Sequence, residues 1–181
     1  MNDVSLIIIW VLITITMVSL VAVIGKRYGI EYLIATLATL VIMANIFASK
    51  IVLFGPFTVP AGVLVFSMTF LITDIINEYW GKRYAYKGIF AGFLASIIFI
   101  VSIHIVVAWQ PAPFASQAAV SFEEVFSYTP RILLAFFVAY LISQYHDVWS
   151  FNFWKKKTMG KHLWLRNNIS TMTSQLIDSV V

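Results

Sequence analysis

Residues 59–85 read VPAGVLVFSMTFLITDIINEYWGKRYA, an apolar run that ends in polar and then basic residues. The run over 58–79 has the roughly 20 residues that an α-helix needs to cross about 30 Å of hydrocarbon. Similar runs fall at 5–25, 32–54, 86–109 and 130–149, and a sixth opens near Asn167. The sequence therefore predicts an all-α, polytopic membrane helix bundle with five full spans and a truncated sixth.

The composition supports a membrane protein without a soluble domain. Of the 181 residues, 61% are hydrophobic and 11% are charged, against about 45–50% and 25% in soluble domains. We expect one transmembrane domain over residues 1–181, with an incomplete C-terminal helix because only about 15 residues follow Arg166. There is no cysteine and the three histidines lack ligand spacing, so we expect no metal site and no cofactor.

Basic residues alternate between the predicted connections and so indicate the orientation. The net charge is +4, and because these charges lie between apolar runs they do not indicate nucleic-acid binding. Lys and Arg concentrate on the cytoplasmic side of membrane proteins. The alternation predicts a multi-pass protein of the cell (inner) membrane with its N-terminus outside. The residues that carry this inference are Lys26, Arg27, Lys82, Arg83, Lys87, Lys155, Lys156, Lys157, Lys161 and Arg166.

One face of the third span is polar. Asp74, Asn77 and Glu78 have i, i+3 and i+4 spacing and therefore share a helix face. A carboxylate in contact with lipid costs several kcal/mol, so this face should point into the bundle or a wet cavity. The alternative is that Glu78 lies at the interface and pairs with Lys82.

A second polar stripe lies near the C-terminus, where Gln175 and Asp178 follow Thr171 and Ser174 at helical spacing. If the helix enters near Asn167, Asp178 lies about 16 Å deep, where an ionisable residue is a functional candidate. The alternative is a carboxyl group that hydrogen-bonds neighbouring hydroxyls as part of helix packing. We expect Asp178 and Asp74 to line one aqueous cavity.

Two residues of the second span can join this site. Asn45 lies mid-helix, and Lys50 follows it on the same span. Lys50 is either a counter-ion for Asp74 or Asp178 or a side chain that extends to the outer interface. His104 and Gln144 are isolated in their spans and are assigned to packing or to the membrane interface.

Catalytic motifs are absent from the sequence. Gly81-Lys82 lacks the other residues of a Walker A motif, and there is no G-x-S-x-G or H-E-x-x-H. We therefore expect no enzyme activity. In the long outer connection, Ser121 and Glu124 have capping-box spacing, which predicts a short helix from Phe122 to Tyr128.

Three segments together resemble a known family. They are NIFASKIVLFG (45–55), the 59–85 block quoted above, and STMTSQLIDS (170–179). The chain is similar in these segments to the queuosine precursor transporters, which are also grouped as vitamin uptake transporters. The resemblance implies a six-helix membrane protein that imports a 7-deazaguanine such as preQ0, preQ1 or queuine for tRNA modification.

Such a ligand presents N–H donors beside a carbonyl acceptor, so its site needs carboxylates, amide or ammonium donors and an aromatic plane. Candidate rings are Phe66, Phe70 and Tyr79. The alternative function is a membrane subunit that binds a vitamin-like ligand and needs a separate ATPase. The expected partners are a nucleobase-like small molecule and the lipid bilayer, with a homo-oligomer or an energising partner left open. The predicted substrate-binding residues are Asn45, Lys50, Asp74, Asn77, Glu78, Gln175 and Asp178.

Overall fold

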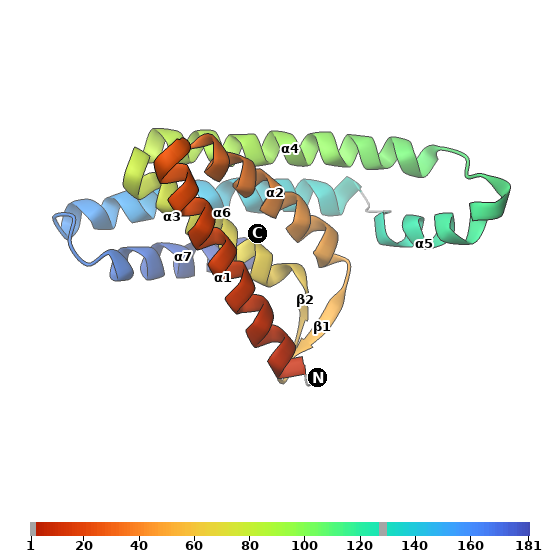
Figure 1. The fold of residues 1–181 in the computed structure, drawn as a ribbon, viewed down its shortest axis with the longest axis horizontal. Coiled ribbons are helices and arrows are strands. Elements are labelled where there is room, and N and C mark those ends of the chain that lie inside the picture. Colours follow the sequence, from red (N-terminus) through yellow and green to blue (C-terminus); the bar gives the residue numbers. More distant parts are fainter. Residues whose placement is uncertain (1–2, 127–129) are drawn as a thin grey trace.

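The computed structural model describes residues 3–126 and 130–181, which form a helix bundle with one small hairpin (Figure 1). The helices are α1 (Asp3–Tyr28), α2 (Glu31–Ala48), α3 (Gly62–Trp80), α4 (Lys82–Ala108), α5 (Ser116–Phe126), α6 (Pro130–Lys157) and α7 (Leu163–Val180), with a 3₁₀ turn, η1 (Pro113–Ala115), before α5. The strands are β1 (Ile51–Phe54) and β2 (Phe57–Pro60).

Four of the described helices, α1 to α4, are long and apolar enough to cross a membrane. Large apolar side chains such as Leu12, Val23 and Ile98 are more than half exposed on them, which only lipid or a partner surface can cover. The predicted fold class, an all-α membrane helix bundle, is therefore confirmed.

The second predicted span, over 32–54, is wrong at its C-terminal end. The α2 helix stops at Ala48, and Ile51–Phe54 forms β1, which pairs antiparallel with β2. A positive φ of 61° at Gly55 suits the first central position of a type II′ hairpin turn, which favours glycine. The apolar residues after Lys50 therefore belong to a hairpin, because hydropathy alone does not separate a helix end from a short strand.

The apolar core lies where α2, α3 and α4 meet. Leu37, Ile76 and Ile89 are fully buried there. A Cβ at Gly62 would collide with the backbone carbonyl of Ala44, so glycine allows α3 to start against α2. Small residues at such contacts let membrane helices approach closely.

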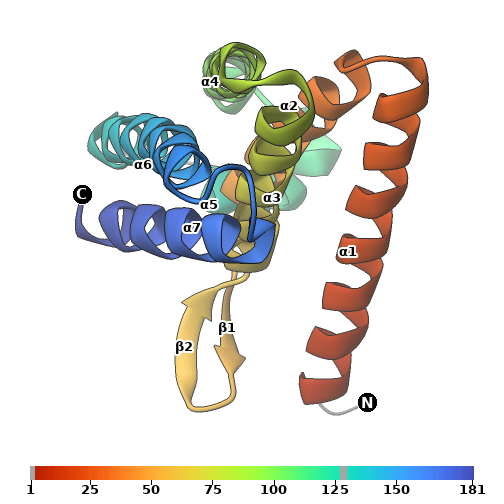
Figure 2. The same cartoon turned by 90° about the vertical axis from the view of Figure 1, so that its left-hand side faces the viewer.

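A second, polar core lies where α3, α6 and α7 meet. Figure 2 shows α7 below α6 with its first turns beside the lower part of α3, and α1 on the other side of α3. The α7 helix begins at Leu163, earlier than the predicted start near Asn167, so Arg166 belongs to the helix and is 1% exposed. The prediction that Arg166 lies in the connection before this helix is therefore wrong.

The basic connections gather at one end of the bundle. Lys26 lies 5.1 Å from the ring of Tyr79, and Lys82 and Lys156 line one cavity. The α5 helix lies at the opposite end of α4 and α6 (Figure 1). It begins at Ser116 rather than at a cap on Ser121, and the predicted end at Tyr128 lies outside the described residues.

Candidate functional site

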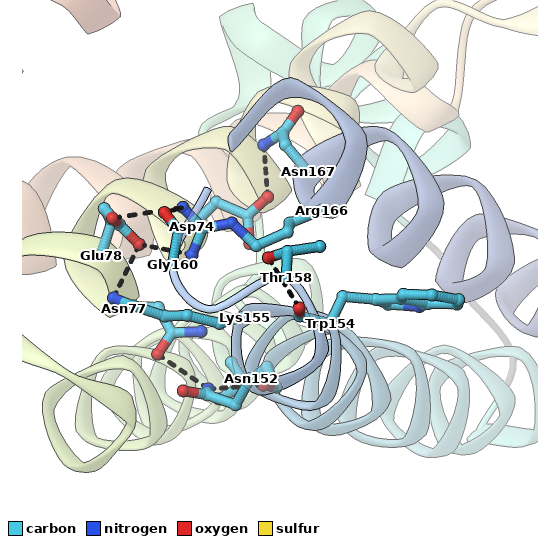
Figure 3. A network of polar contacts seen from close by, with 11 residues as sticks. Asp74, Asn77, Glu78, Asn152, Trp154, Lys155, Thr158, Gly160, Arg166 and Asn167 are labelled. Atoms are coloured by element: carbon cyan, nitrogen blue, oxygen red, sulfur yellow. Dashed lines mark hydrogen bonds and ion pairs between the residues drawn. The ribbon is translucent and has the colours of Figure 1, made fainter. Parts of the chain in front are cut away.

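The polar core is organised around an ion pair between α3 and α7 (Figure 3). Arg166 Nη1 lies 3.1 Å from Glu78 Oε2, and Nη2 lies 3.3 Å from Oε1. Lys155 of α6 donates to the same Oε2 at 2.8 Å. Glu78 therefore binds two cations from other helices instead of Lys82, and it joins all three helices.

Asp74 lies one turn before Glu78 on α3 and is 3% exposed. One of its oxygens, Oδ2, accepts a hydrogen bond from the Asn167 amide. The other, Oδ1, has no hydrogen-bond partner among the described residues. Asp147 of α6 faces Asp74 from the neighbouring helix, so two buried carboxyl groups lie side by side.

Amide and hydroxyl groups extend the contacts along α3. Asn152 of α6 donates to Asn77 Oδ1 at 2.9 Å. Gln144 donates to Thr69 at 2.7 Å, and Gln175 donates to Ser67 at 3.2 Å. Gln144 is fully buried and bridges α6 to α3 through hydrogen bonds, so of the two predicted alternatives it is a packing residue and not an interface residue.

An inner cavity of about 530 Å³ lies between α3 and the start of α7. This volume falls within the roughly 300–1,000 Å³ of small-molecule sites. Two carboxylates, two amides and two aromatic rings line it together with apolar side chains. The polar and aromatic lining residues are Asp74, Glu78, Tyr79, Trp164, Asn167 and Asn168.

A smaller outer cavity of about 190 Å³ contains Asn45, Phe66 and Asp178. Asp178 accepts a hydrogen bond from Ser143 at 3.2 Å. The expectation that Asp74 and Asp178 line one cavity is therefore wrong. The two carboxylates lie on opposite sides of the Ser67–Gln175 contact, because α7 runs antiparallel to α3.

The seven predicted binding residues do not form one cluster. Asp74 and Glu78 line the inner cavity, and Asn45 and Asp178 line the outer one. Asn77 faces α6, and Gln175 bridges to α3 between the cavities. Lys50 is exposed beside the hairpin, in a cavity shared with α1, and pairs with neither Asp74 nor Asp178 among the described residues. Its extended position matches the interface alternative.

Several residues of the polar core were missed from the sequence. Asp147 lies within the predicted span 130–149, so an ionisable residue inside a span was an available signal. The sequence indicates Lys155 and Arg166 only as markers of topology. Asn152 and Asn167 carried no separate signal, because their roles depend on the register between helices.

Membrane-length helices around a buried polar core, with carboxylates beside a cavity, are typical of membrane transporters. The family described as "Putative vitamin uptake transporter" matches residues 60–181, a segment that contains α3, α6 and α7. The chain belongs to this family, which confirms the resemblance seen in the sequence.

A curated relative is the "Probable queuosine precursor transporter" of Bacillus subtilis (strain 168). The two proteins are 28% identical over 174 residues, which cover 95% of this chain and 75% of the relative. No solved structure gives a significant match.

Proposed function

We propose that this protein imports a queuosine precursor of the 7-deazaguanine type, such as preQ0, preQ1 or queuine, across the cell membrane. The family and the name of the Bacillus relative support transport of this class. The observation that carries the proposal is the inner cavity, which combines the carboxylate of Asp74 with amide donors and aromatic rings.

Asp74 is the carboxylate best suited to the ligand's N–H edge. Glu78 is held by Arg166 and Lys155, whereas Asp74 forms no ion pair among the described residues and accepts a hydrogen bond from Asn167. The Asn167 amide donates one hydrogen to Asp74 and carries a second that can reach the ligand carbonyl. The Trp164 ring is exposed in the cavity and offers a stacking surface.

During import, the substrate then occupies the outer cavity before it reaches the inner cavity. Asn45 and Asp178 are a donor and an acceptor there, and Gln175 lies between the two cavities. At about 190 Å³ this cavity is below the usual range for a closed ligand site, so we assign tight binding to the inner cavity.

The arrangement in the membrane forms part of the proposal. Helices α1, α2, α3, α4 and α6 cross completely, and α7 forms a partial sixth span within one transmembrane domain. The end of the bundle with Arg83 and Lys156 faces the cytoplasm, because basic residues favour that side. The N-terminus and Gln117 then lie outside, and the inner cavity lies near the cytoplasmic end.

The test is direct binding of preQ1 and queuine to the purified protein by calorimetry, with 7-deazaadenine as the comparison. A site that hydrogen-bonds the guanine-type edge rejects an analogue lacking it by a large factor. The proposal would be contradicted if 7-deazaadenine bound as tightly as preQ1 and queuine, or if neither preQ1 nor queuine bound.

Uptake by the protein reconstituted alone into liposomes separates the two functional hypotheses. A transporter accumulates or exchanges radiolabelled ligand by itself. A binding subunit that depends on an ATPase binds the ligand but does not move it.

A further inference from the structure

Both carboxylate oxygens of Asp147 are buried without a hydrogen-bond partner among the described residues, and the side chain is fully buried. It faces Asp74 and the hydroxyls of Ser170 and Ser174. Both hydroxyls also contact other groups. Ser170 donates to the Asn167 carbonyl at 3.1 Å, and Ser174 Oγ lies 2.8 Å from His146 Nδ1. Neither hydroxyl makes a hydrogen bond to Asp147, whose two oxygens lack a partner among the described residues.

The charges around Asp147 do not balance. Both nearby cations, Lys155 and Arg166, are bonded to Glu78, and Arg166 acts on Asp74 only through space. Three carboxyl groups thus share two cations, which leaves one excess negative charge in a buried site. The titratable and charged groups that face this site are Asp74 and Glu78 of α3, His146, Asp147 and Lys155 of α6, and Arg166 of α7.

We propose that Asp74 and Asp147 together bind one proton, and that this proton drives import of the substrate. The inference rests on the proposed function and adds its energy source. One proton removes the excess charge and supplies the hydrogen that two facing carboxyl groups require, since like charges in contact disfavour double ionisation. A metal ion fits less well, because no group of three His, Cys, Asp or Glu among the described residues could hold one.

The two carboxyl groups have different neighbours, and this difference gives the coupling. Asp74 lines the inner cavity, whereas Asp147 lies behind it against α7. With the proton on Asp147, Asp74 stays ionised and accepts the N–H groups of the substrate. When the proton leaves, the two carboxylates repel each other, so the substrate and the proton bind and leave together.

The expected direction of the pH dependence of substrate affinity follows from this arrangement. Substrate affinity is highest at low pH, where the pair holds its proton. At pH values above the range in which the Asp74–Asp147 pair loses its proton, the Kd for the substrate should rise about tenfold per pH unit, as linkage to a single proton requires. Asp147→Asn imitates the protonated residue, so its affinity should no longer change with pH in this way.

The experiment measures preQ1 and queuine uptake into liposomes that contain the purified protein, with an imposed pH gradient and a pH dye outside. We expect an acidic exterior to drive accumulation, uptake to make the exterior more alkaline, and a protonophore to abolish both. Asp147→Asn should lose gradient-driven accumulation at least tenfold, while the exposed control Glu124→Gln keeps it.

Two results would overturn the proton site. One is wild-type uptake that ignores the pH gradient or follows a sodium gradient. The other is an Asp147→Asn protein that still accumulates substrate in response to the pH gradient. The wild-type measurements decide the matter if Asp147→Asn fails to fold. Binding that persists without proton movement refutes this inference alone, whereas absence of binding by the wild type refutes the proposed function.

Discussion

Arg166 of α7 and Glu78 of α3 meet through two parallel contacts of 3.1 and 3.3 Å, and Arg166 also lies 5.1 Å from the ring of Phe151. The guanidinium is almost fully buried, whereas Glu78 keeps 27% of its side chain exposed. This geometry makes the pair a link between the C-terminal helix and the rest of the bundle.

Arg166→Ala should destabilise the protein by about 2–3 kcal/mol. Removal of one partner from a buried pair costs about 3–5 kcal/mol, and the partial exposure of Glu78 together with its remaining bond to Lys155 lowers that cost. Arg166→Lys should recover only part of the loss, because lysine cannot make two parallel contacts. Chemical unfolding in detergent measures both changes.

The control for this prediction is Lys161→Ala, at an exposed position just before α7. An exposed substitution of this kind should shift the free energy of unfolding by no more than about 0.5 kcal/mol. Equal shifts at positions 161 and 166 would show that the ion pair adds nothing to stability.

The sequence predicts the features that depend on hydropathy and on position along one helix. The run over 58–79 predicts a membrane-length helix, and the spacing of Asp74 and Asn77 predicts that both lie on the buried side of α3, as they do. These predictions succeed because burial of apolar surface and the 3.6-residue period act within a single segment.

The partners of those residues depend on contacts between segments, and the sequence does not give them. Glu78 pairs with Lys155 and Arg166, which lie 77 and 88 positions away, whereas spacing offered only Lys82. Asp178 is separated from Asp74 because Asp74 contacts Asn167, and Asp178 lies about 16 Å further along α7. The register between helices is set by side-chain packing across the whole bundle. It is therefore difficult to predict from a single sequence.

Accessibility of single cysteines should follow the proposed orientation. Arg83→Cys and Lys156→Cys lie at the basic end of the bundle, and Gln117→Cys lies on α5; all three positions are exposed. In intact cells, a membrane-impermeant maleimide should label position 117 and should reach 83 and 156 only after the membrane is opened. External labelling of 156 but not of 117 would reverse the topology.

Trp164→Ala should weaken binding of preQ1 or queuine by about 1–3 kcal/mol, the scale of stacking between a base and an aromatic ring. Trp164 is 66% exposed and lines the inner cavity, so its loss should affect binding more than folding. Trp164→Phe should recover part of the affinity because it keeps a flat ring.

Trp109→Ala provides the matched control, because Trp109 is also exposed but lies at the far end of α4. Calorimetric titration of the three variants should place Trp109→Ala at the wild-type Kd. The stacking role is refuted if Trp164→Ala binds as tightly as that control.

The two carboxylates expected to share a cavity should now differ in their effect on binding. Asp74→Asn removes the charge of a carboxylate that lines the inner cavity, and it should weaken binding by about 1.5–3 kcal/mol, the scale of a hydrogen bond to a charged group. That loss corresponds to a Kd about 10- to 100-fold higher. Asp178→Asn keeps the shape of a residue that lines only the outer cavity and should change the equilibrium Kd by less than about threefold.

The comparison requires that both variants fold, which melting curves in detergent check first. Asp178→Asn can still slow uptake, because the outer cavity lies earlier on the proposed path, so binding and transport are measured separately. Equal losses of affinity in the two variants would place the ligand against both carboxylates and would contradict the separation of the cavities. Unchanged affinity in Asp74→Asn would remove the inner cavity as the binding site, because the N–H edge of the ligand would then have no charged acceptor there other than Glu78, which Arg166 and Lys155 already occupy.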